Sequence, residues 1–180
     1  MASTYWDIWE TANMNVALGK IIENIRDKLV KRPDKATVTF VSQSNLQGVF
    51  RSEVNVRDHV FQVDEPPPMG GDNAGPNPVE LTLAALGTCQ EMTYRLCATA
   101  MGIEIARVSA KVEGDLDMRG LFAVDDAVRP GLQKVRLTIT LESNASPAEL
   151  EELKCQVNAH CPVLDILRNP VPVEVAYVAN

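Results

Sequence analysis

The sequence has little positive charge. Lysine and arginine together number 17 against 24 acidic residues, so the net charge is −7 and the pI is near 4.9. Binding to nucleic acid or to an anionic membrane needs clustered basic side chains, and the most basic stretch here is "LVKRPDK" (29–35). We therefore expect neither nucleic acid nor a membrane among the partners of this protein.

Long apolar runs and cysteines are also scarce. No apolar stretch reaches the roughly 18 residues that a membrane-spanning helix needs. The start of the chain, "MASTYWDIWETANMNVALG", lacks the basic and apolar regions of a signal peptide. Four cysteines among 180 residues do not make a secreted disulfide framework. These absences predict a cytoplasmic protein, in which a close cysteine pair is more often catalytic or metal-binding than structural.

Several motifs of enzymes and of metal proteins are missing. Two histidines and no G-x-S-x-G sequence leave little room for a serine hydrolase. No C-x₂-C or H-x₃-H spacing indicates a metal site. The glycine-rich "GGDNAG" (70–75) lacks the lysine of a phosphate-binding loop. We expect no metal and no cofactor.

What is present favours an α+β fold, because helical and strand patterns alternate along the chain and 46% of the residues are apolar. Residues 11–31 have the spacing of an amphipathic helix. Residues 36–65 predict a three-stranded meander, with strands in "KATVTFVS" (35–42), "VFRSEVNV" (49–56) and "HVFQVDE" (59–65). These patterns predict that the chain is divided into an N-terminal helical extension (1–35) and one domain (36–180).

The second half of the chain carries strong helix signals. Asn77 and Glu80 suit a capping box for a helix from Pro78 to about Met101, and Gly102 suits its end. Strands are expected within 103–117 and over 132–142, with a polar loop between them. The predicted order ends with three elements: a helix from 147 to about 160, a short helix from 162, and an edge strand in "PVPVEVAYV" (170–178).

Two cysteines occupy unusual positions. Cys161 precedes Pro162, which disfavours helical geometry at Cys161. The preceding helix should therefore end there, and Cys161 should cap the next one with free backbone N–H groups near its sulfur. Cys89 lies in the middle of the long helix, where burial would raise the pKa of its thiol. The residues alone leave packing, metal binding and redox chemistry open for this pair.

Two segments together resemble the OsmC/Ohr family. They are "DEPPPMGGDNAGPNPVELTLAALGTCQEMT" (64–93) and, about 70 residues later, "HCPVLDIL" followed by "NPVPVEV". The resemblance spans roughly residues 36–178 and implies an OsmC-like fold, with antiparallel sheets wrapped around long central helices in an intertwined homodimer. The N-terminal helix lies outside it.

The resemblance also implies an activity. Peroxidatic members of the family reduce organic hydroperoxides, and their two cysteines match Cys89 as the peroxidatic residue and Cys161 as the resolving residue. The first cysteine becomes a sulfenic acid and the second condenses with it to a disulfide. A dithiol reductant of the lipoyl type then reopens the disulfide. The expected function is a thiol peroxidase that acts in oxidative stress.

The sequence departs from the peroxidatic pattern at two places. Those members carry a glutamate directly after Asn-Pro, where this chain has Val79, with Glu80 one position later. They also carry an arginine in the first hairpin, but the tip "SQSNLQG" (42–48) has none. Arg51 is the candidate for the missing cation, and Glu80 completes the candidate site. The alternatives are a non-catalytic OsmC-like dimer that binds a small hydrophobic ligand, and a purely structural dimer.

Overall fold

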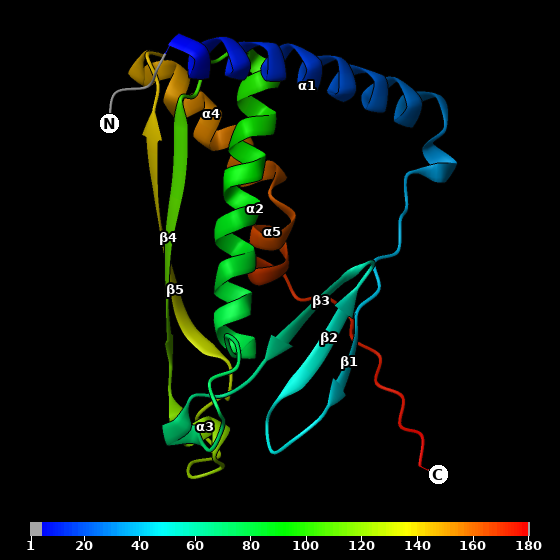
Figure 1. Ribbon diagram of the computed structural model, residues 1–180, viewed down its shortest axis with the longest axis vertical. Helices are drawn as coiled ribbons and strands as arrows, with labels where there is room; N and C mark the ends of the chain where they lie inside the picture. The colour runs from blue at the N-terminus through cyan, green and yellow to red at the C-terminus, as the bar shows by residue number, and fades with distance from the viewer. Residues whose placement is uncertain (1–4, 180) are drawn as a thin grey trace. The chain divides into compact units, whose positions relative to one another are not determined.

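The computed structural model describes residues 5–179 and forms two compact units. One comprises the chain up to Ala85 together with residues 112–136, and the other comprises Leu86–Lys111 together with the chain from Leu137 on. Helices and strands mix along the chain as an α+β fold requires (Figure 1). Among residues 5–179, no helix has the length and hydropathy needed to cross a bilayer. The division at residue 35 stays a prediction.

The first helix, α1 (Tyr5–Lys31), begins before the predicted residue 11 and ends where predicted. Pro33 cannot continue the helix, and it opens a short 3-10 turn, η1 (Pro33–Lys35). The side chain of Ile22 is buried, whereas those of Ile21 and Ile25 are exposed. Over residues 16–31, where side chains are described, the helix therefore leaves most of its apolar stripe uncovered.

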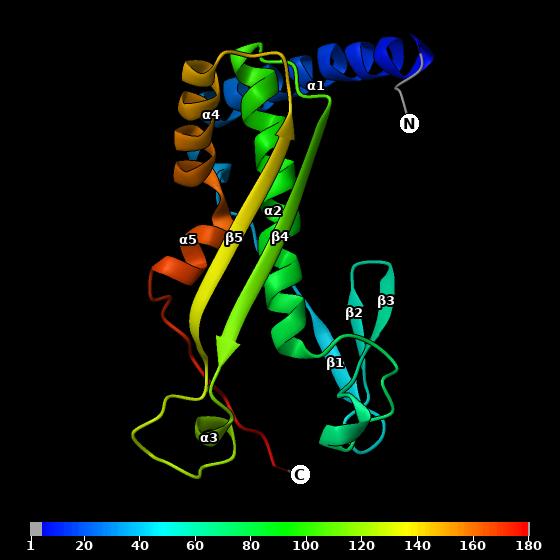
Figure 2. The ribbon, with the colours of Figure 1, turned by 90° about the vertical axis from the view of Figure 1, so that its left-hand side faces the viewer.

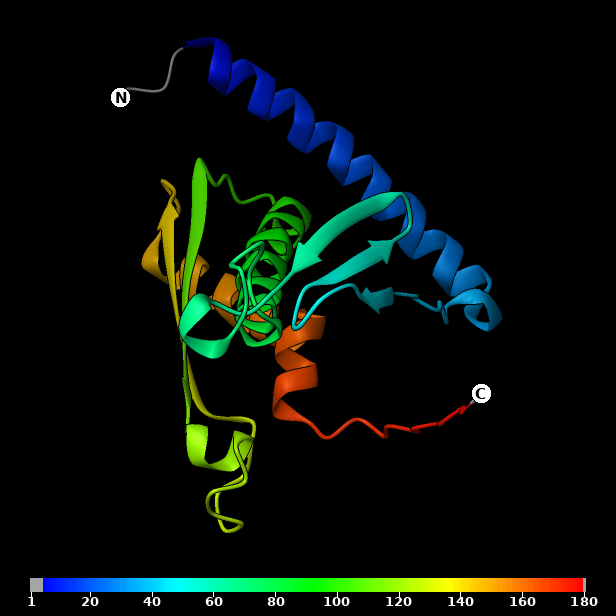
Figure 3. The same cartoon turned by 60° about the horizontal axis from the view of Figure 1, so that its bottom comes forward.

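The first unit contains a three-stranded antiparallel sheet of β1 (Gln43–Leu46), β2 (Ser52–Val56) and β3 (His59–Val63), seen in Figure 3. The meander is confirmed, but the strand predicted at 35–42 is wrong, because pairing starts only at Gln43, opposite Asn55. The turn closed by the Gln47 N–H to the Arg51 carbonyl (2.8 Å) sets this register. As a result, the β-branched residues before Gln43 lie beyond the end of β2, and none of the described strands pairs with them.

The long helix α2 (Pro78–Met101) has the predicted bounds. Its capping box is complete, since the Asn77 N–H donates to Glu80 (2.8 Å) and the Glu80 N–H donates to the Asn77 side chain (2.9 Å). Gly102 ends the helix at φ +70°, a conformation that glycine adopts without strain. The helix is therefore defined at both ends by its own local sequence.

The remaining elements are β4 (Arg107–Leu116), the one-turn α3 (Met118–Leu121), β5 (Leu132–Glu142), α4 (Pro147–His160) and α5 (Pro162–Arg168). β4 and β5 pair in opposite directions (Figure 2). The structure places α3 inside the predicted loop. It also shows that the edge strand predicted at 170–178 is wrong: these residues are extended and exposed, because a strand needs a neighbour and none of the described strands pairs with them.

The core of the second unit lies where the C-terminal half of α2 meets α4 and the strands. Its buried members are Tyr94, Cys97, Ala98, Ile105, Leu153 and Val157. α4 begins at the predicted residue 147, behind a complete capping box formed by Ser146 and Glu149. This packing fixes α4, and therefore its C-terminal end, against α2.

Candidate functional site

Cys161 lies at the junction of α4 and α5. Its backbone is non-helical (φ −81°, ψ 110°), as expected for the residue before Pro162. The Cys161 N–H donates to the Val157 carbonyl and its own carbonyl accepts from the Asp165 N–H, each at 3.0 Å. The junction therefore ends one helix and starts the next without an unpaired backbone group at Cys161. Its side chain is 1% exposed.

The two predicted cysteines lie together within the second unit. The Cys161 thiol donates to the sulfur of Cys89 across 3.4 Å, and both thiols are free. A disulfide requires the sulfurs to be about 2.0 Å apart, so a small movement of either side chain would join them. Cys89 is half-buried and Cys161 is buried, so the pair sits at the edge of the protein interior.

Burial raises the pKa of the Cys89 thiol above its ordinary value, and the neighbouring Cys161 raises it further. A hydrogen bond from the Val163 backbone N–H lowers the pKa of Cys89, but it does not outweigh burial. Within the second unit, none of the groups that shift this pKa is a cation. A thiolate at Cys89, the reactive form of a cysteine, would therefore need a positive charge from outside this set of groups.

Sequence reasoning missed Val163 and Thr93. It placed the free N–H groups of α5 at the sulfur of Cys161, but the Cys161 side chain makes no capping hydrogen bond. The Val163 N–H bonds to Cys89 instead. Thr93 lies one helical turn after Cys89, and its hydroxyl donates to the Cys89 carbonyl at 2.7 Å. The i, i+4 spacing could have indicated Thr93, whereas a backbone donor such as Val163 carries no sequence signal.

The other two cysteines lie outside the pair. Cys97 belongs to the buried core and Cys155 is exposed on α4. Among the described residues, no group of three or more histidine, cysteine or acidic side chains is arranged to hold a metal ion. Of the chemistries left open by the sequence, the geometry of Cys89 and Cys161 suits a reversible thiol–disulfide couple.

Arg51 lies in the first unit, where it contacts the proline- and glycine-rich loop before α2. Its guanidinium donates to Asp72 at 2.9 Å and remains partly exposed, while its Nε is buried without a partner among the described residues. The same loop is organised by Asp64, which is 2% exposed and accepts the backbone N–H groups of Glu65, Asp72 and Ala74. Burial opposes ionisation of Asp64, but these three bonds and the charge of Arg51 hold its pKa below the usual value.

Glu80 also lies in the first unit, and its carboxylate is used by the capping box with Asn77. Its side chain is exposed. The structure thus brings Cys89 and Cys161 together in one unit and places Arg51 and Glu80 in the other. The catalytic roles of Arg51 and Glu80 stay predictions.

Comparison with known proteins gives a consistent assignment of the fold. A family model described as OsmC-like protein matches residues 70–176. No curated protein matches the chain. The chain is similar to the solved structure of an OsmC-like protein from Mycoplasma pneumoniae, with 20% identity, a TM-score of 0.65, and coverage of 74% of this chain and 89% of that one.

Two further solved structures have the same fold. An organic hydroperoxide resistance protein OsmC from Legionella pneumophila is 23% identical, with a TM-score of 0.57 and coverage of 74% of this chain and 92% of that one. An OsmC-like protein of unknown function from Vibrio cholerae is 12% identical, with a TM-score of 0.58 and coverage of 72% and 93%. At these identities the similarity concerns the fold alone.

Proposed function

This chain belongs to the OsmC-like protein family, and we propose that it is a thiol peroxidase that reduces organic hydroperoxides with Cys89 and Cys161. The family includes hydroperoxide reductases. The observation that carries the proposal is the 3.4 Å separation of the two free sulfurs. When such a pair is oxidised to a disulfide, it supplies the two electrons that reduction of a peroxide consumes.

The reaction balances with these two residues and a dithiol. The Cys89 thiolate attacks the terminal peroxide oxygen, the O–O bond breaks, and the alkoxide leaves as an alcohol after taking up a proton. Cys89 becomes a sulfenic acid. The Cys161 sulfur then attacks the Cys89 sulfur, water leaves, and the disulfide forms. A lipoyl-type dithiol reduces this disulfide and restores both thiols.

Apolar side chains favour an organic substrate over hydrogen peroxide. Ala85, Leu86 and Met92 lie on the same face of α2 as Cys89, at helical spacings of three or four residues. Leu86 is buried, whereas Ala85 and Met92 are exposed and can contact a substrate. Each CH₂ group of a substrate that such a surface covers contributes about 0.8 kcal/mol to binding. A bulky hydroperoxide such as cumene hydroperoxide gains from this contact, and H₂O₂ does not.

Oxidation by one equivalent of cumene hydroperoxide is expected to consume two thiols per chain and to join Cys89 to Cys161. Peptide mapping under non-reducing conditions measures this linkage, and Cys97 and Cys155 in the same digest serve as internal controls. Oxidation should be faster with cumene hydroperoxide than with H₂O₂. The proposal fails if the protein is oxidised no faster than free cysteine at the same pH.

The raised pKa of Cys89 weighs against peroxide chemistry and leaves a non-catalytic function as the alternative. A protonated thiol is a poor nucleophile, and Val79 stands where peroxidatic members carry glutamate. In this alternative the chain is a non-catalytic OsmC-like dimer that binds a small hydrophobic ligand. If a folded protein fails the oxidation experiment, the peroxidase is excluded, and the ligand-binding dimer and the purely structural dimer are the functions left to test.

We assign the activating cation of the peroxidase to Arg51. Its guanidinium is partly exposed and keeps a buried Nε without a partner among the described residues, so it has a donor to offer beyond its ion pair with Asp72. In a dimer, Arg51 of one subunit would act on Cys89 of the other. A guanidinium close to a thiol stabilises the thiolate and lowers its pKa.

The protein is expected to be a homodimer, because a single copy exposes apolar side chains on α2 and on the two unpaired segments before β1 and after α5. Met92 on α2 is 72% exposed, and the extended segments before β1 and after α5 expose Phe40 (90%) and Tyr177 (89%). Unpaired extended backbone in both segments can accept a strand from a second copy. Sedimentation equilibrium at micromolar concentration should give twice the chain mass of 19.7 kDa. A stable monomer would contradict this expectation.

A further inference from the structure

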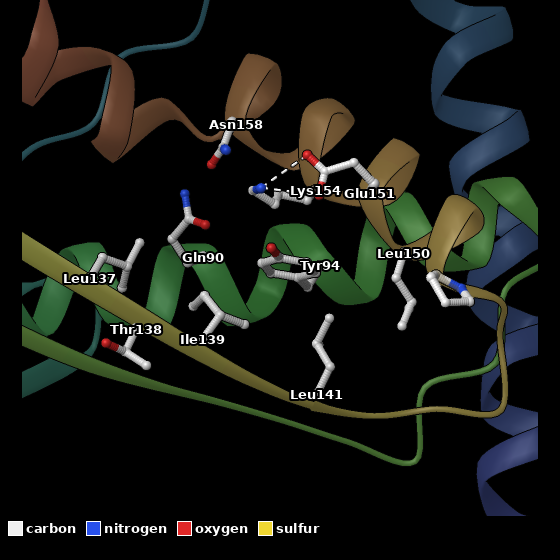
Figure 4. Close-up of a pocket in the computed structure, with 11 residues that line it drawn as sticks. Gln90, Tyr94, Leu137, Thr138, Ile139, Leu141, Leu150, Glu151, Lys154 and Asn158 are labelled. Atoms are coloured by element: carbon white, nitrogen blue, oxygen red, sulfur yellow. Dashed lines mark hydrogen bonds and ion pairs between the residues drawn. The ribbon is translucent and has the colours of Figure 1, made fainter.

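The second unit contains a pocket that the two cysteines do not line. It has a volume of about 480 Å³ and lies between α2, β5 and α4 (Figure 4). This volume is in the range of small-molecule sites, which is about 300–1,000 Å³. The proposed peroxidase reaction uses none of its lining residues, so the pocket calls for a separate explanation.

The walls of the pocket differ in polarity. Apolar side chains from β5 and α4 form one part: Leu137, Ile139, Leu141 and Leu150. The polar part consists of Gln90 and Tyr94 from α2 and of Lys154 and Asn158 from α4, and Figure 4 shows these four side chains pointing toward one another. A surface of this kind suits a ligand with an apolar body and one polar group.

Gln90 offers the pocket a side-chain donor that no described residue uses. Its side chain is 1% exposed, and its Nε2 is buried with no hydrogen-bond partner among the described residues. A buried amide left without a partner destabilises the fold, and buried polar groups are nearly always paired. The donor of Gln90 is therefore available for an acceptor in the pocket, such as a carbonyl oxygen.

The charge of the pocket indicates a neutral ligand. The Lys154 ammonium is already paired with both oxygens of Glu151, at 2.9 and 3.1 Å, so its charge is compensated. Burial raises the pKa of Tyr94, which keeps its hydroxyl neutral. An anionic ligand would have to compete with the Glu151 carboxylate for the lysine. A neutral group that both donates and accepts matches the amides of Gln90 and Asn158.

We propose that this pocket binds a small neutral carboxamide with an aliphatic or aryl body. The carbonyl oxygen of the ligand accepts from Gln90 Nε2, and its N–H donates toward the side chain of Asn158. The apolar body lies against Leu137, Ile139 and Leu141. The site is independent of the thiols and does not rest on the proposed peroxidase activity.

The first test uses 4-phenylbutanamide as the probe, with the side-chain amide of Gln90 followed by ¹⁵N NMR in the intact protein. Binding should be about millimolar, as expected for a probe of this size, and should shift the Gln90 side-chain signal. Two control compounds keep the apolar body: 4-phenylbutanoate replaces the amide with a charged carboxylate, and butylbenzene lacks a polar group. Each should bind at least about tenfold more weakly than 4-phenylbutanamide. Equal binding of the three compounds, or no shift at Gln90, would overturn the proposal.

The second test is the variant Gln90→Leu, with Gln156→Leu as the matched control. Gln156 lies on α4, is paired with Glu152 (3.3 Å), and is not a lining residue. Removing the unpaired buried amide should raise the melting temperature by about 3 °C and weaken binding of 4-phenylbutanamide at least about tenfold. The control should bind the probe as the wild type does. A lower melting temperature for Gln90→Leu would show that the fold itself uses the amide, and would refute the ligand site.

Discussion

Replacement of Cys89 with serine is expected to lower the rate of hydroperoxide reduction by a factor on the order of 10³ or more. A serine hydroxyl stays protonated at neutral pH and is a poor nucleophile without a general base. Removal of the attacking atom from an enzyme commonly costs this much or more. The rate should be measured in steady state with cumene hydroperoxide and a lipoyl-type dithiol, on protein whose fold has been checked by circular dichroism.

The variant Cys161→Ser should behave differently from Cys89→Ser. Its Cys89 can still attack one peroxide, but the sulfur that lies 3.4 Å away is gone, so the sulfenic acid cannot condense within the site. Dimedone should therefore trap one adduct per chain at Cys89, detected by intact mass, and turnover with the dithiol should slow. In the wild type the disulfide should form before the trap reacts.

Cys155→Ser is the matched control, because Cys155 is exposed and outside the pair. It should keep the wild-type rate and the wild-type disulfide. Undiminished turnover in Cys89→Ser would contradict the assignment of the peroxidatic residue, and undiminished disulfide formation in Cys161→Ser would contradict the assignment of its partner.

Helix boundaries were predictable because each is defined by nearby residues. α2 is bounded by the Asn77–Glu80 capping box and by Gly102, and α4 begins at the box formed by Ser146 and Glu149. These contacts span a few residues of sequence, so their chemistry can be recognised before any tertiary structure is known. The same holds for Cys161, whose place between two helices follows from Pro162.

Strands were predicted less well, because a strand exists only through pairing. The segments 35–42 and 170–178 have strong β propensity, yet no described strand of this chain pairs with either. Propensity records how well side chains fit a pleated sheet and says nothing about whether a neighbour is present. The turn at Gln47 and Arg51 selects the actual partner of β2.

The candidate site was only partly predictable for a similar reason. Helical spacing left Cys89 and Cys161 as two separate cysteines, and it was the family resemblance that joined them. The Val163 N–H at Cys89 is a backbone group, which every residue except proline has, so no motif marks it. The pocket at Gln90 depends on contacts between α2, β5 and α4, which no local pattern contains.

Removal of the Arg51 charge is expected to slow oxidation of Cys89 by about 10- to 100-fold at pH 7. Burial raises the pKa of Cys89, so the thiolate fraction at neutral pH depends on a compensating cation. A cation within a few ångströms lowers a thiol pKa by about 1–3 units. In Arg51→Ala the pKa of Cys89 should rise by that amount, and each unit lowers the thiolate fraction about tenfold below the pKa.

The pH profile identifies the cause of the slower oxidation. Since the thiolate is the reacting form, the rate rises with pH until the pKa of Cys89 is passed. The profile of Arg51→Ala should keep the same shape and move to higher pH, so the rates of the two proteins should converge in alkaline solution. Stopped-flow measurements with cumene hydroperoxide between pH 6 and about 10 cover the range in which a thiol titrates. A uniform loss of rate at all pH values would indicate a damaged site instead of a lost charge.

Asp72→Ala separates the charge of Arg51 from its role in the loop. This variant breaks the same 2.9 Å ion pair but keeps the guanidinium, so the pH profile should stay at the wild-type position or move to lower pH as Arg51 becomes free to act on the thiolate. Arg51→Lys keeps a positive charge and should recover part of the rate. If Asp72→Ala slows oxidation as much as Arg51→Ala does, the ion pair is needed for the loop and the activating cation must be another residue.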